Sequence, residues 1–466
     1  MRRFTRVWLV MFLAAMTLVP LDASADVQKS ARSLAHPSAT AHAFVTSENA
    51  VIAWNNAAAD AALASCLAPT NSPLHESRMY AMMHLAIHDA LNAIDRRSRP
   101  YALDIHVSGA SPTAAVAAAA HGVLVPLLNE LPAPFSDCVA SSHAVSAVDA
   151  DYAAAIGAVP DGVAKTRGIA LGQAAAAVML AVRAADGSDT PLFDTAYPQG
   201  TAPGEYRFTP GQTFAFAPGW GHVTPFVLKN ALQFKPAPPY AVTSKKYAED
   251  FNEVKRLGGD GITTPSARTP DQTQMARFWV ESSPLLWNRV GRTVATQKGL
   301  NLWESARLFG LLNMALADGY IGTFATKYQV YNYWRPVTAI RAAATDGNPW
   351  TEADPTWTEL VPTPPIPDYD SGHSVEGGAA AQVLMRFFGT DHADFSICSY
   401  TLLPGETCAD ASPVMRHYTS FSGASDENGL SRILVGFHFR KAVTAGIDHG
   451  AKIGNRTVSL FLRPVH

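Results

Sequence analysis

Apolar side chains recur at intervals of three and four residues along most of this chain, a spacing that predicts helices with one apolar face. In Glu76–Ile94 the apolar positions are Met79, Met82, Met83, Ala86, Ile87, Ala90 and Leu91. Similar spacing or Ala-rich composition predicts helices over Val51–Cys66, Thr113–Leu131, Asp149–Ile156, Gly162–Ala185, Ser244–Leu257, Pro270–Trp279, Leu300–Thr326 and Ser374–Phe388. Thr269 before Pro270 is a typical helix start. Because the strict alternation of apolar and polar residues that is typical of strands is rare here, we expect an all-α fold, a helical bundle.

The segment Gly187–Thr243 breaks this pattern, since it is rich in Pro, Gly and aromatic residues. Linkers are usually polar, so its aromatic side chains predict a packed crossover that lies on the helical body and shapes a pocket mouth. These side chains are Tyr206, Phe208, Phe214, Phe216, Trp220 and Phe226. We expect one helical domain over residues 26–466. It would comprise N-terminal helices (48–186), the crossover (187–243) and a C-terminal half (244–466).

The composition limits the classes of partner. The formal net charge is −3 and hydrophobic residues reach 48%. This balance argues against a nucleic-acid-binding protein or one that binds anionic membranes, and any recognition of an anion must be local.

The first 25 residues have the pattern of a signal peptide. Arg2, Arg3 and Arg6 precede an apolar stretch over Val7–Val19, and Ala23–Ala25 would form the cleavage site. An uncleaved anchor is the alternative, although the stretch is short for a bilayer. We therefore expect a periplasmic or secreted protein with no stable membrane span.

The four cysteines are compatible with export, and none is spaced as a zinc site. Cys398 and Cys408 flank a short loop that a local disulfide would close. Cys66 and Cys138 would then pair by elimination. Free buried thiols remain the alternative.

Three segments of the last third combine basic residues, histidines and a helix start. They are Lys327–Pro336, followed by Arg341, then Pro367–His373, and Ser431–Arg440. Arg335 and Arg432 stand in apolar or aromatic surroundings, where a guanidinium needs a partner. The partner is either an oxyanion or a structural carboxylate such as Asp318, Glu376 or Glu427.

The second and third segments add groups that suit an oxyanion. Ser371-Gly372-His373 opens a predicted helix, whose free N–H groups attract an anion, and Gly lets the backbone approach closely. His373 can act there as an acid or a base. His438 follows Arg432 by six residues on what we predict to be an apolar helix. Each motif alone is weak evidence, whereas three in order indicate a shared anion site.

These motifs resemble those of the vanadium-dependent haloperoxidases, bacterial class A acid phosphatases and type 2 phosphatidic acid phosphatases. That superfamily has Lys, six residues, then Arg-Pro; Pro-Ser-Gly-His; and Ser-Arg, five residues, then His. The third motif matches fully, and the other two match in part. Further stretches resemble the bacterial haloperoxidase branch, so the resemblance covers most of the mature chain. These are Ala86–Asn92, Asn313–Asp318, Asn332–Arg341, Thr363–His373 and Gly436–Phe439.

The resemblance implies a helical bundle of the haloperoxidase/acid phosphatase type that holds vanadate. Lys327, Arg335 and Arg432 would then neutralise the oxygens of vanadate. Ser371 and the N–H of Gly372 would hydrogen-bond to it. His438 would ligate vanadium axially. His373 would act as the acid or base that helps peroxide bind, and Lys327 would help to polarise the peroxide.

The sequence departs from the family pattern at three places. Seven residues separate Lys327 from Arg335, which rotates the pair by about 100° on a regular helix unless a π-bulge absorbs the extra residue. Asp370 replaces the proline before Ser371, where it would either cap the helix or point inward and weaken anion binding. Ala442 replaces an Asp that the family often has four residues after the ligand His.

Three functions are compatible with these residues. The first is a haloperoxidase that uses H2O2 and a halide, with a small organic acceptor as a further partner. The second is an acid phosphatase that binds phosphate and works through a phospho-histidine at His438. The third is a non-catalytic periplasmic oxyanion-binding protein. Ile366 lies where the family places a side chain near the halide, but it does not decide halide preference. The resemblance also allows a homo-oligomer.

Overall fold

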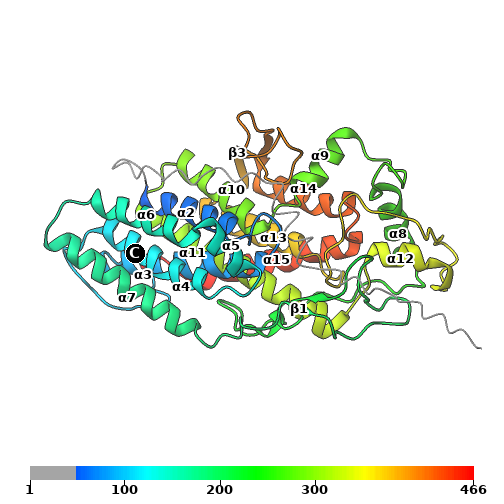
Figure 1. The fold of residues 1–466 in the computed structure, drawn as a ribbon, viewed down its shortest axis with the longest axis horizontal. Helices are drawn as coiled ribbons and strands as arrows, with labels where there is room; N and C mark the ends of the chain where they lie inside the picture. The colour runs from blue at the N-terminus through cyan, green and yellow to red at the C-terminus, as the bar shows by residue number, and fades with distance from the viewer. Residues whose placement is uncertain (1–48, 466) are drawn as a thin grey trace, which may run out of the picture. The chain divides into compact units, whose positions relative to one another are not determined.

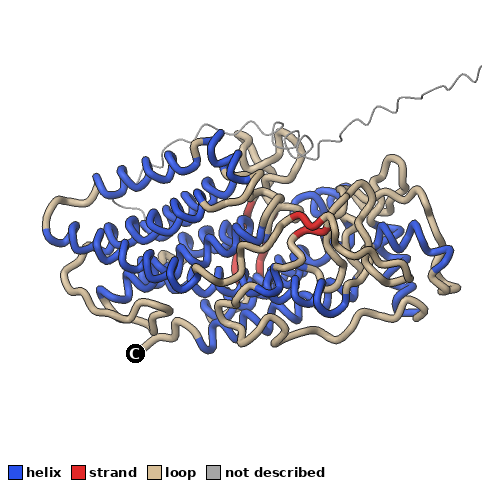
Figure 2. The backbone as a smooth tube through the Cα atoms, turned by 60° about the horizontal axis from the view of Figure 1, so that its bottom comes forward, coloured by secondary structure: helices blue, strands red, loops and turns tan. Residues whose placement is uncertain are grey.

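The computed structural model describes residues 49–465, so the predicted signal peptide lies outside the described residues. The described chain is mostly helical, with two short antiparallel strand pairs (Figures 1 and 2). The all-α prediction is confirmed.

The α-helices are α2 (Ala50–Ala64), α3 (Pro73–Ile94), α4 (Pro112–Asn129), α5 (Phe135–Ser142), α6 (Ala144–Gly157), α7 (Val163–Arg183), α8 (Lys245–Leu257), α9 (Pro270–Phe278), α10 (Ser283–Gln297), α11 (Leu302–Ala325), α12 (Pro336–Ala342), α13 (Gly372–Phe388), α14 (Phe421–Leu434) and α15 (Arg440–Leu460). Shorter helical turns are η1 (Trp220–His222), η2 (Thr326–Tyr331) and η3 (Ala343–Thr345). Strands β1 (Phe193–Asp194) and β2 (Ala215–Phe216) pair, as do β3 (His392–Ile397) and β4 (Arg416–Ser420).

Local sequence explains where several helices begin. At α9, the Thr269 side chain accepts a hydrogen bond from the N–H of Gln272, and the Gln272 side chain accepts one from the N–H of Thr269. Asn301 and Glu304 form the same reciprocal cap at α11. Such caps satisfy N–H groups that the first turn leaves free. The predicted start of α9 is therefore confirmed.

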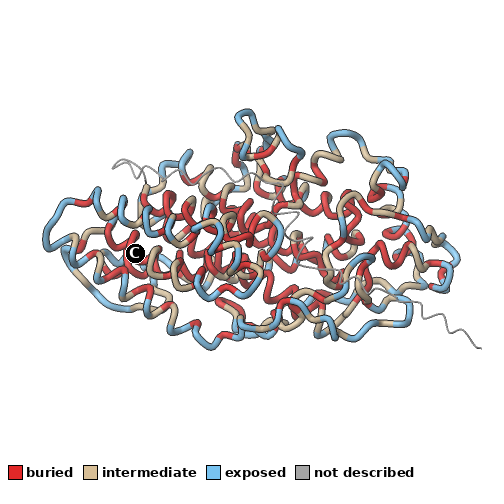
Figure 3. The backbone as a smooth tube through the Cα atoms, viewed as in Figure 1, coloured by how far each residue is buried: buried red, intermediate tan, exposed pale blue. Residues whose placement is uncertain are grey.

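Helix α11 lies at the centre of the core and packs against α3, α13 and α15. Figure 3 shows how buried positions concentrate along these central helices. Close packing of α15 on α13 depends on glycines: a Cβ at Gly450 would lie 1.9 Å from the carbonyl oxygen of Val375. A small residue there lets α15 support the first turns of α13.

Two helical stretches of the described chain, Pro112–Asn129 and Leu302–Tyr331, are long and apolar enough to cross a membrane. The most apolar window of the second is entirely buried within the protein, and 61% of that of the first is buried. Core helices of this kind have the same composition as membrane spans.

The crossover between α7 and α8 is packed, as predicted. Tyr206 and Trp220 are fully buried. Gly221 lies so close to the end of α11 that a Cβ there would come within 2.5 Å of the Ala325 backbone. Further along, three consecutive N–H groups, at residues 226–228, donate to the carboxylate of Asp318. The crossover is thereby attached to α11 beside the segment that carries Lys327.

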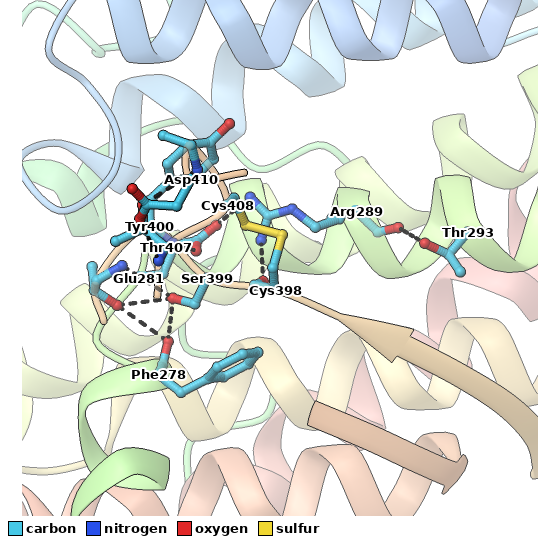
Figure 4. The surroundings of a disulfide bond; sticks show 12 residues. Phe278, Glu281, Arg289, Thr293, Cys398, Ser399, Tyr400, Thr407, Cys408 and Asp410 are labelled. Atoms are coloured by element: carbon cyan, nitrogen blue, oxygen red, sulfur yellow. Dashed lines mark hydrogen bonds and ion pairs between the residues drawn. A yellow bond between two sulfur atoms is a disulfide. The ribbon is translucent and has the colours of Figure 1, made fainter. Parts of the chain in front are cut away.

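Both predicted disulfides are present, Cys66–Cys138 and Cys398–Cys408. Figure 4 shows the second bridge, whose loop holds the segment between α9 and α10. The Ser399 hydroxyl donates to the carbonyl of Phe278, and the N–H of Tyr400 donates to the carboxylate of Glu281 (2.7 Å for each bond). This loop therefore fixes the backbone at Glu281, which contacts a histidine of the candidate site.

Candidate oxyanion site

Lys327 lies in the π-helical segment η2, directly after α11. The N–H of Asn332 donates to the carbonyl of Lys327, five residues earlier, which is the π-helical pattern. Of the two alternatives that the spacing left open, the π-turn is present, and it absorbs the extra residue between Lys327 and Arg335. The Lys327 ammonium is fully buried and donates to the carbonyls of Pro367 (2.6 Å) and Asp368 (2.8 Å). Burial, together with the nearby Arg335 charge, lowers its pKa well below the usual value.

Arg335 caps the start of α12, where Pro336 takes the first helical position. Its guanidinium is buried and donates to the carbonyls of Ile366 (2.6 Å) and Phe437 (2.9 Å). Nη1 of Arg335 also lies 2.9 Å from Nε2 of His438. The first and third motifs therefore meet in space.

The second motif begins α13, as predicted, with Ser371 at the N-cap. The Ser371 hydroxyl accepts a hydrogen bond from Ser374 (2.9 Å). A Cβ at Gly372 would find no atom nearer than 3.9 Å, so this glycine leaves space beside the N-terminus of α13. That space and the free N–H groups of the first turn suit a small anion.

His373 projects from the first turn of α13, and the segment just before α10 holds its ring. Its Nε2 lies 3.1 Å from the carbonyl oxygen of Glu281. Because a carbonyl only accepts, Nε2 carries the proton, and Nδ1 of the neutral ring is left as an acceptor. Burial and the charge of Arg432 lower the pKa of His373 well below its usual value, which keeps the ring neutral.

Arg432 lies in the last turn of α14 and is 1% exposed. Its Nε donates to the Ser431 hydroxyl (3.1 Å), whereas its Nη2 has no hydrogen-bond partner within the described chain. Burial lowers the pKa of Arg432 to about 9. Of the carboxylates considered as partners from the sequence, Glu427 pairs with Arg416 and Asp318 accepts from backbone N–H groups.

His438 is not on a helix, so that prediction is wrong. α14 ends at Leu434, and Gly436 adopts a φ of +90°, which L-residues disfavour. The chain then turns back so that the N–H of His438 donates to the carbonyl of Arg432 (3.2 Å). This turn, rather than helical spacing, brings the imidazole next to Arg335.

The neighbours of His438 determine its tautomer. Nδ1 lies 2.9 Å from Oδ1 of Asp368, and Nε2 lies 2.9 Å from the Arg335 guanidinium. Since the carboxylate accepts and the guanidinium only donates, the proton resides on Nδ1 and Nε2 keeps its lone pair. Burial and the charges of Arg335 and Lys327 lower the pKa of His438 well below its usual value. A neutral imidazole with an unprotonated Nε2 is the form that can ligate a metal.

Asp370 does not cap α13, which excludes one of the two alternatives that the sequence left open. One oxygen of its buried carboxylate accepts from the Thr323 hydroxyl (2.6 Å), and the other lies 2.9 Å from Nδ1 of His449. These partners occupy the carboxylate, and it makes no ion pair with the site arginines. Sequence reasoning named Asp370 but missed Asp368, whose role depends on a contact with a histidine 70 residues away.

Within the described residues, Lys327, Arg335 and Arg432 are buried cations that form no ion pair with a carboxylate at 4.0 Å or less. The buried Arg183, in contrast, pairs with Asp186 at 2.8 Å. Burying a charge without a partner is costly. Three such charges beside two neutral histidines therefore form a site that favours an anion.

Comparisons with known proteins agree with this geometry. The family model described as "VCPO second helical-bundle domain" matches residues 307–466, which include Lys327, Arg335, Ser371, Gly372, His373, Arg432 and His438. The vanadium chloroperoxidase of Curvularia inaequalis is 25% identical over 289 residues, which cover 50% of this chain and 47% of that protein. The chain thus matches about half the length of this curated relative.

Solved structures give a wider match. The crystal structure of the first bacterial vanadium-dependent iodoperoxidase has a TM-score of 0.70 and 24% identity, and covers 90% of this chain and 98% of that one. An apo-type bacterial vanadium-dependent chloroperoxidase has a TM-score of 0.63 and 15% identity, and covers 84% of this chain and 94% of that one. The predicted resemblance is therefore confirmed: this chain has the fold of the bacterial vanadium-dependent haloperoxidases, and its residues 307–466 match the second helical-bundle domain of the vanadium chloroperoxidase family.

Proposed function

We propose that this protein is a vanadate-dependent haloperoxidase, which oxidises a halide with H2O2 to hypohalous acid. The observation that carries the proposal is the cluster of three buried cations without carboxylate partners beside Nε2 of His438. The similarity to a vanadium chloroperoxidase and to bacterial vanadium haloperoxidases supports vanadate as the anion.

The residues present fit this cofactor. Nη2 of Arg432 is buried without a partner, and Gly372 leaves room at the N-terminus of α13. Lys327, Arg335 and Arg432 would neutralise the oxygens of vanadate, while Ser371 and the N–H of Gly372 would hydrogen-bond to it. His438 would ligate the metal through Nε2. When bound, vanadate supplies a Lewis acid that polarises peroxide without a change in its own oxidation state.

His373 is suited to move a proton during the reaction. The Glu281 carbonyl holds its Nε2–H, so Nδ1 is free to take a proton from H2O2 and later to return it. The overall reaction, H2O2 + halide + H+ → hypohalous acid + H2O, consumes one proton and oxidises the halide by two electrons. Lys327 makes two hydrogen bonds to backbone carbonyls, which leaves one of its three N–H groups for a developing negative charge.

The test uses the purified protein with orthovanadate, H2O2 and bromide or iodide, and measures halogenation of a phenolic dye beside hydrolysis of p-nitrophenyl phosphate. We expect vanadate-dependent halogenation. Phosphate release that vanadate inhibits would favour the phosphatase instead, and retention of vanadate with neither activity would favour a binding protein.

Histidine variants separate the two imidazole roles. His438→Ala should abolish vanadate retention, whereas His373→Ala should retain vanadate and lose turnover. His392→Ala, at an exposed position on β3, is the control and should behave as the wild type. Full halogenating activity in His438→Ala would contradict the assignment of the axial ligand.

A further inference from the structure

We propose that Asp368, in the loop before α13, is the positioning residue of His438. It would replace the carboxylate that this chain lacks at position 442. This inference rests on the proposed function, because it assigns how the ligand histidine is held. Asp368 would fix both the ring orientation and the tautomer of His438, so that the unprotonated Nε2 faces Arg335 and the oxyanion site.

The contact between the two side chains is direct and shielded from water. Oδ1 of Asp368 lies 2.9 Å from Nδ1 of His438, and the two side chains are 0% and 5% exposed. Ala442 is fully buried in the first turn of α15, and its carbonyl accepts the N–H of Ser371 (3.1 Å). A methyl group there offers no hydrogen bond to an imidazole, so the described contacts leave Asp368 as the partner of Nδ1.

The loop that carries Asp368 is held on both sides. The N–H of Asp368 donates to the carbonyl of Tyr333 (2.8 Å). The Lys327 ammonium binds the carbonyls of Pro367 and Asp368, and the Arg335 guanidinium binds that of Ile366. A carboxylate on a fixed backbone orients its partner ring more firmly than one on a free loop. The same loop thus couples the positions of Lys327, Arg335 and His438.

A competing interpretation assigns Asp368 the opposite effect. Its second oxygen, Oδ2, is buried and has no hydrogen-bond partner within the described chain, and the charges of Arg335 and Lys327 act on this carboxyl group. Asp368 would then serve as an internal counter-ion that competes with vanadate. The two interpretations predict changes in vanadate affinity of opposite sign, which makes them separable by one measurement.

The experiment titrates the full-length protein with orthovanadate by calorimetry and records the 51V NMR signal of the bound form. Asp368→Asn keeps the shape of the side chain but removes the charge, and its amide can also present a donor to His438. We expect vanadate affinity to fall roughly 10- to 100-fold, as for other residues that orient metal-binding histidines. We also expect the bound 51V signal to shift, which a loss of stability alone would not cause.

Two further variants complete the design. Asp89→Asn is the matched control, because Asp89 is a buried carboxylate on α3 that contacts a different buried histidine, His88, at 3.0 Å. It should lower the melting temperature without changing vanadate affinity. In Asp368→Ala/Ala442→Asp, a carboxylate four residues after His438 should restore part of the affinity that Asp368→Ala loses.

Each result has a defined consequence. Unchanged affinity in folded Asp368→Asn overturns the inference and leaves the proposed function intact, provided that the wild type binds vanadate. Higher affinity supports the counter-ion interpretation and also overturns it. A double variant as weak as Asp368→Ala overturns the claim that the carboxylate moved from position 442. Wild-type protein that binds no vanadate would overturn both the inference and the proposed function.

Discussion

Replacing Arg432 by Met should stabilise the protein when no oxyanion is bound and should prevent vanadate binding. Arg432 is 1% exposed, and its Nε donates to the Ser431 hydroxyl. Its Nη2 has no hydrogen-bond partner within the described chain, and its Cζ lies 5.5 Å from the centroid of the Phe437 ring. The folded protein therefore carries an uncompensated charge that the proposed cofactor would neutralise.

The pKa of Arg432 gives the size of this cost. Burial lowers the pKa from 12.5 to about 9, a difference of about 3.5 units, or roughly 5 kcal/mol, between the folded and unfolded states. At neutral pH the guanidinium is charged in both states, so the whole cost applies. Replacing buried charged groups by apolar residues has stabilised other proteins by about 1–4 kcal/mol. After the loss of the Ser431 hydrogen bond, about 1 kcal/mol, we expect a net gain of about 0–3 kcal/mol for Arg432→Met.

Urea denaturation and thermal melting, each with and without orthovanadate, measure this effect. Without vanadate, Arg432→Met should be more stable than the wild type. At a vanadate concentration of 100 Kd the wild type should gain about 2.7 kcal/mol, whereas the variant should gain nothing. Arg183→Met is the control: Arg183 is equally buried but pairs with Asp186 at 2.8 Å, so its loss should destabilise the protein by about 3–5 kcal/mol. A variant at position 432 that is less stable than the wild type and keeps the full vanadate response would refute this reasoning.

Three other changes test separate parts of the structure. Deleting Gln329 should convert η2 into a regular helical turn with six residues between Lys327 and Arg335, so vanadate binding in calorimetry should be retained, and a loss of binding would contradict the view that the π-turn only absorbs the extra residue. Burial raises the pKa of Glu76 from 4.5 to about 8, so the protonated carboxyl group should stabilise the fold fully below pH 4.5, and this stability should be lost as the pH rises through 8. Glu76→Gln should therefore flatten the dependence of the urea midpoint on pH between 4.5 and 8, and an unchanged slope would contradict the raised pKa. Replacing Cys66 and Cys138 by Ser should lower the free energy of unfolding by about 4 kcal/mol, because their bridge closes a loop with a sequence separation of 72 residues, and an equally stable variant in urea denaturation would count against this estimate.

Sequence reasoning worked where the signal was local. The cap at Thr269, the helix start at Ser371 and the π-turn around Lys327 each follow from a few neighbouring residues and the backbone bonds that they make. The position of His438 could not be predicted in the same way. Apolar spacing favoured a continuous helix through that segment, but Gly436 adopts a positive φ and the chain turns back onto Arg432.

The same limit explains why Asp368 was missed. Asp368 and Asp370 stand in one short segment, and no property of a single sequence distinguishes their surroundings. In the structure the first carboxylate contacts His438 and the second contacts His449. Which of two neighbouring carboxylates serves the site depends on a histidine 70 or 79 residues further along the chain, and such pairing is decided only by the packing of the loop against α15.

The pairing of Asp370 also explains how an anion site can tolerate the residue that replaces the family's proline. A free carboxylate next to Ser371 would repel an oxyanion, whereas here Thr323 and His449 each bind one oxygen of Asp370. All three side chains are buried, so these bonds are not exposed to competition from solvent. The substitution of Pro by Asp therefore need not abolish anion binding, because its charge is directed to partners on α11 and α15. Among the described residues, no ion pair joins Asp370 to the buried cations at positions 327, 335 and 432, although its charge still acts on Lys327 at longer range.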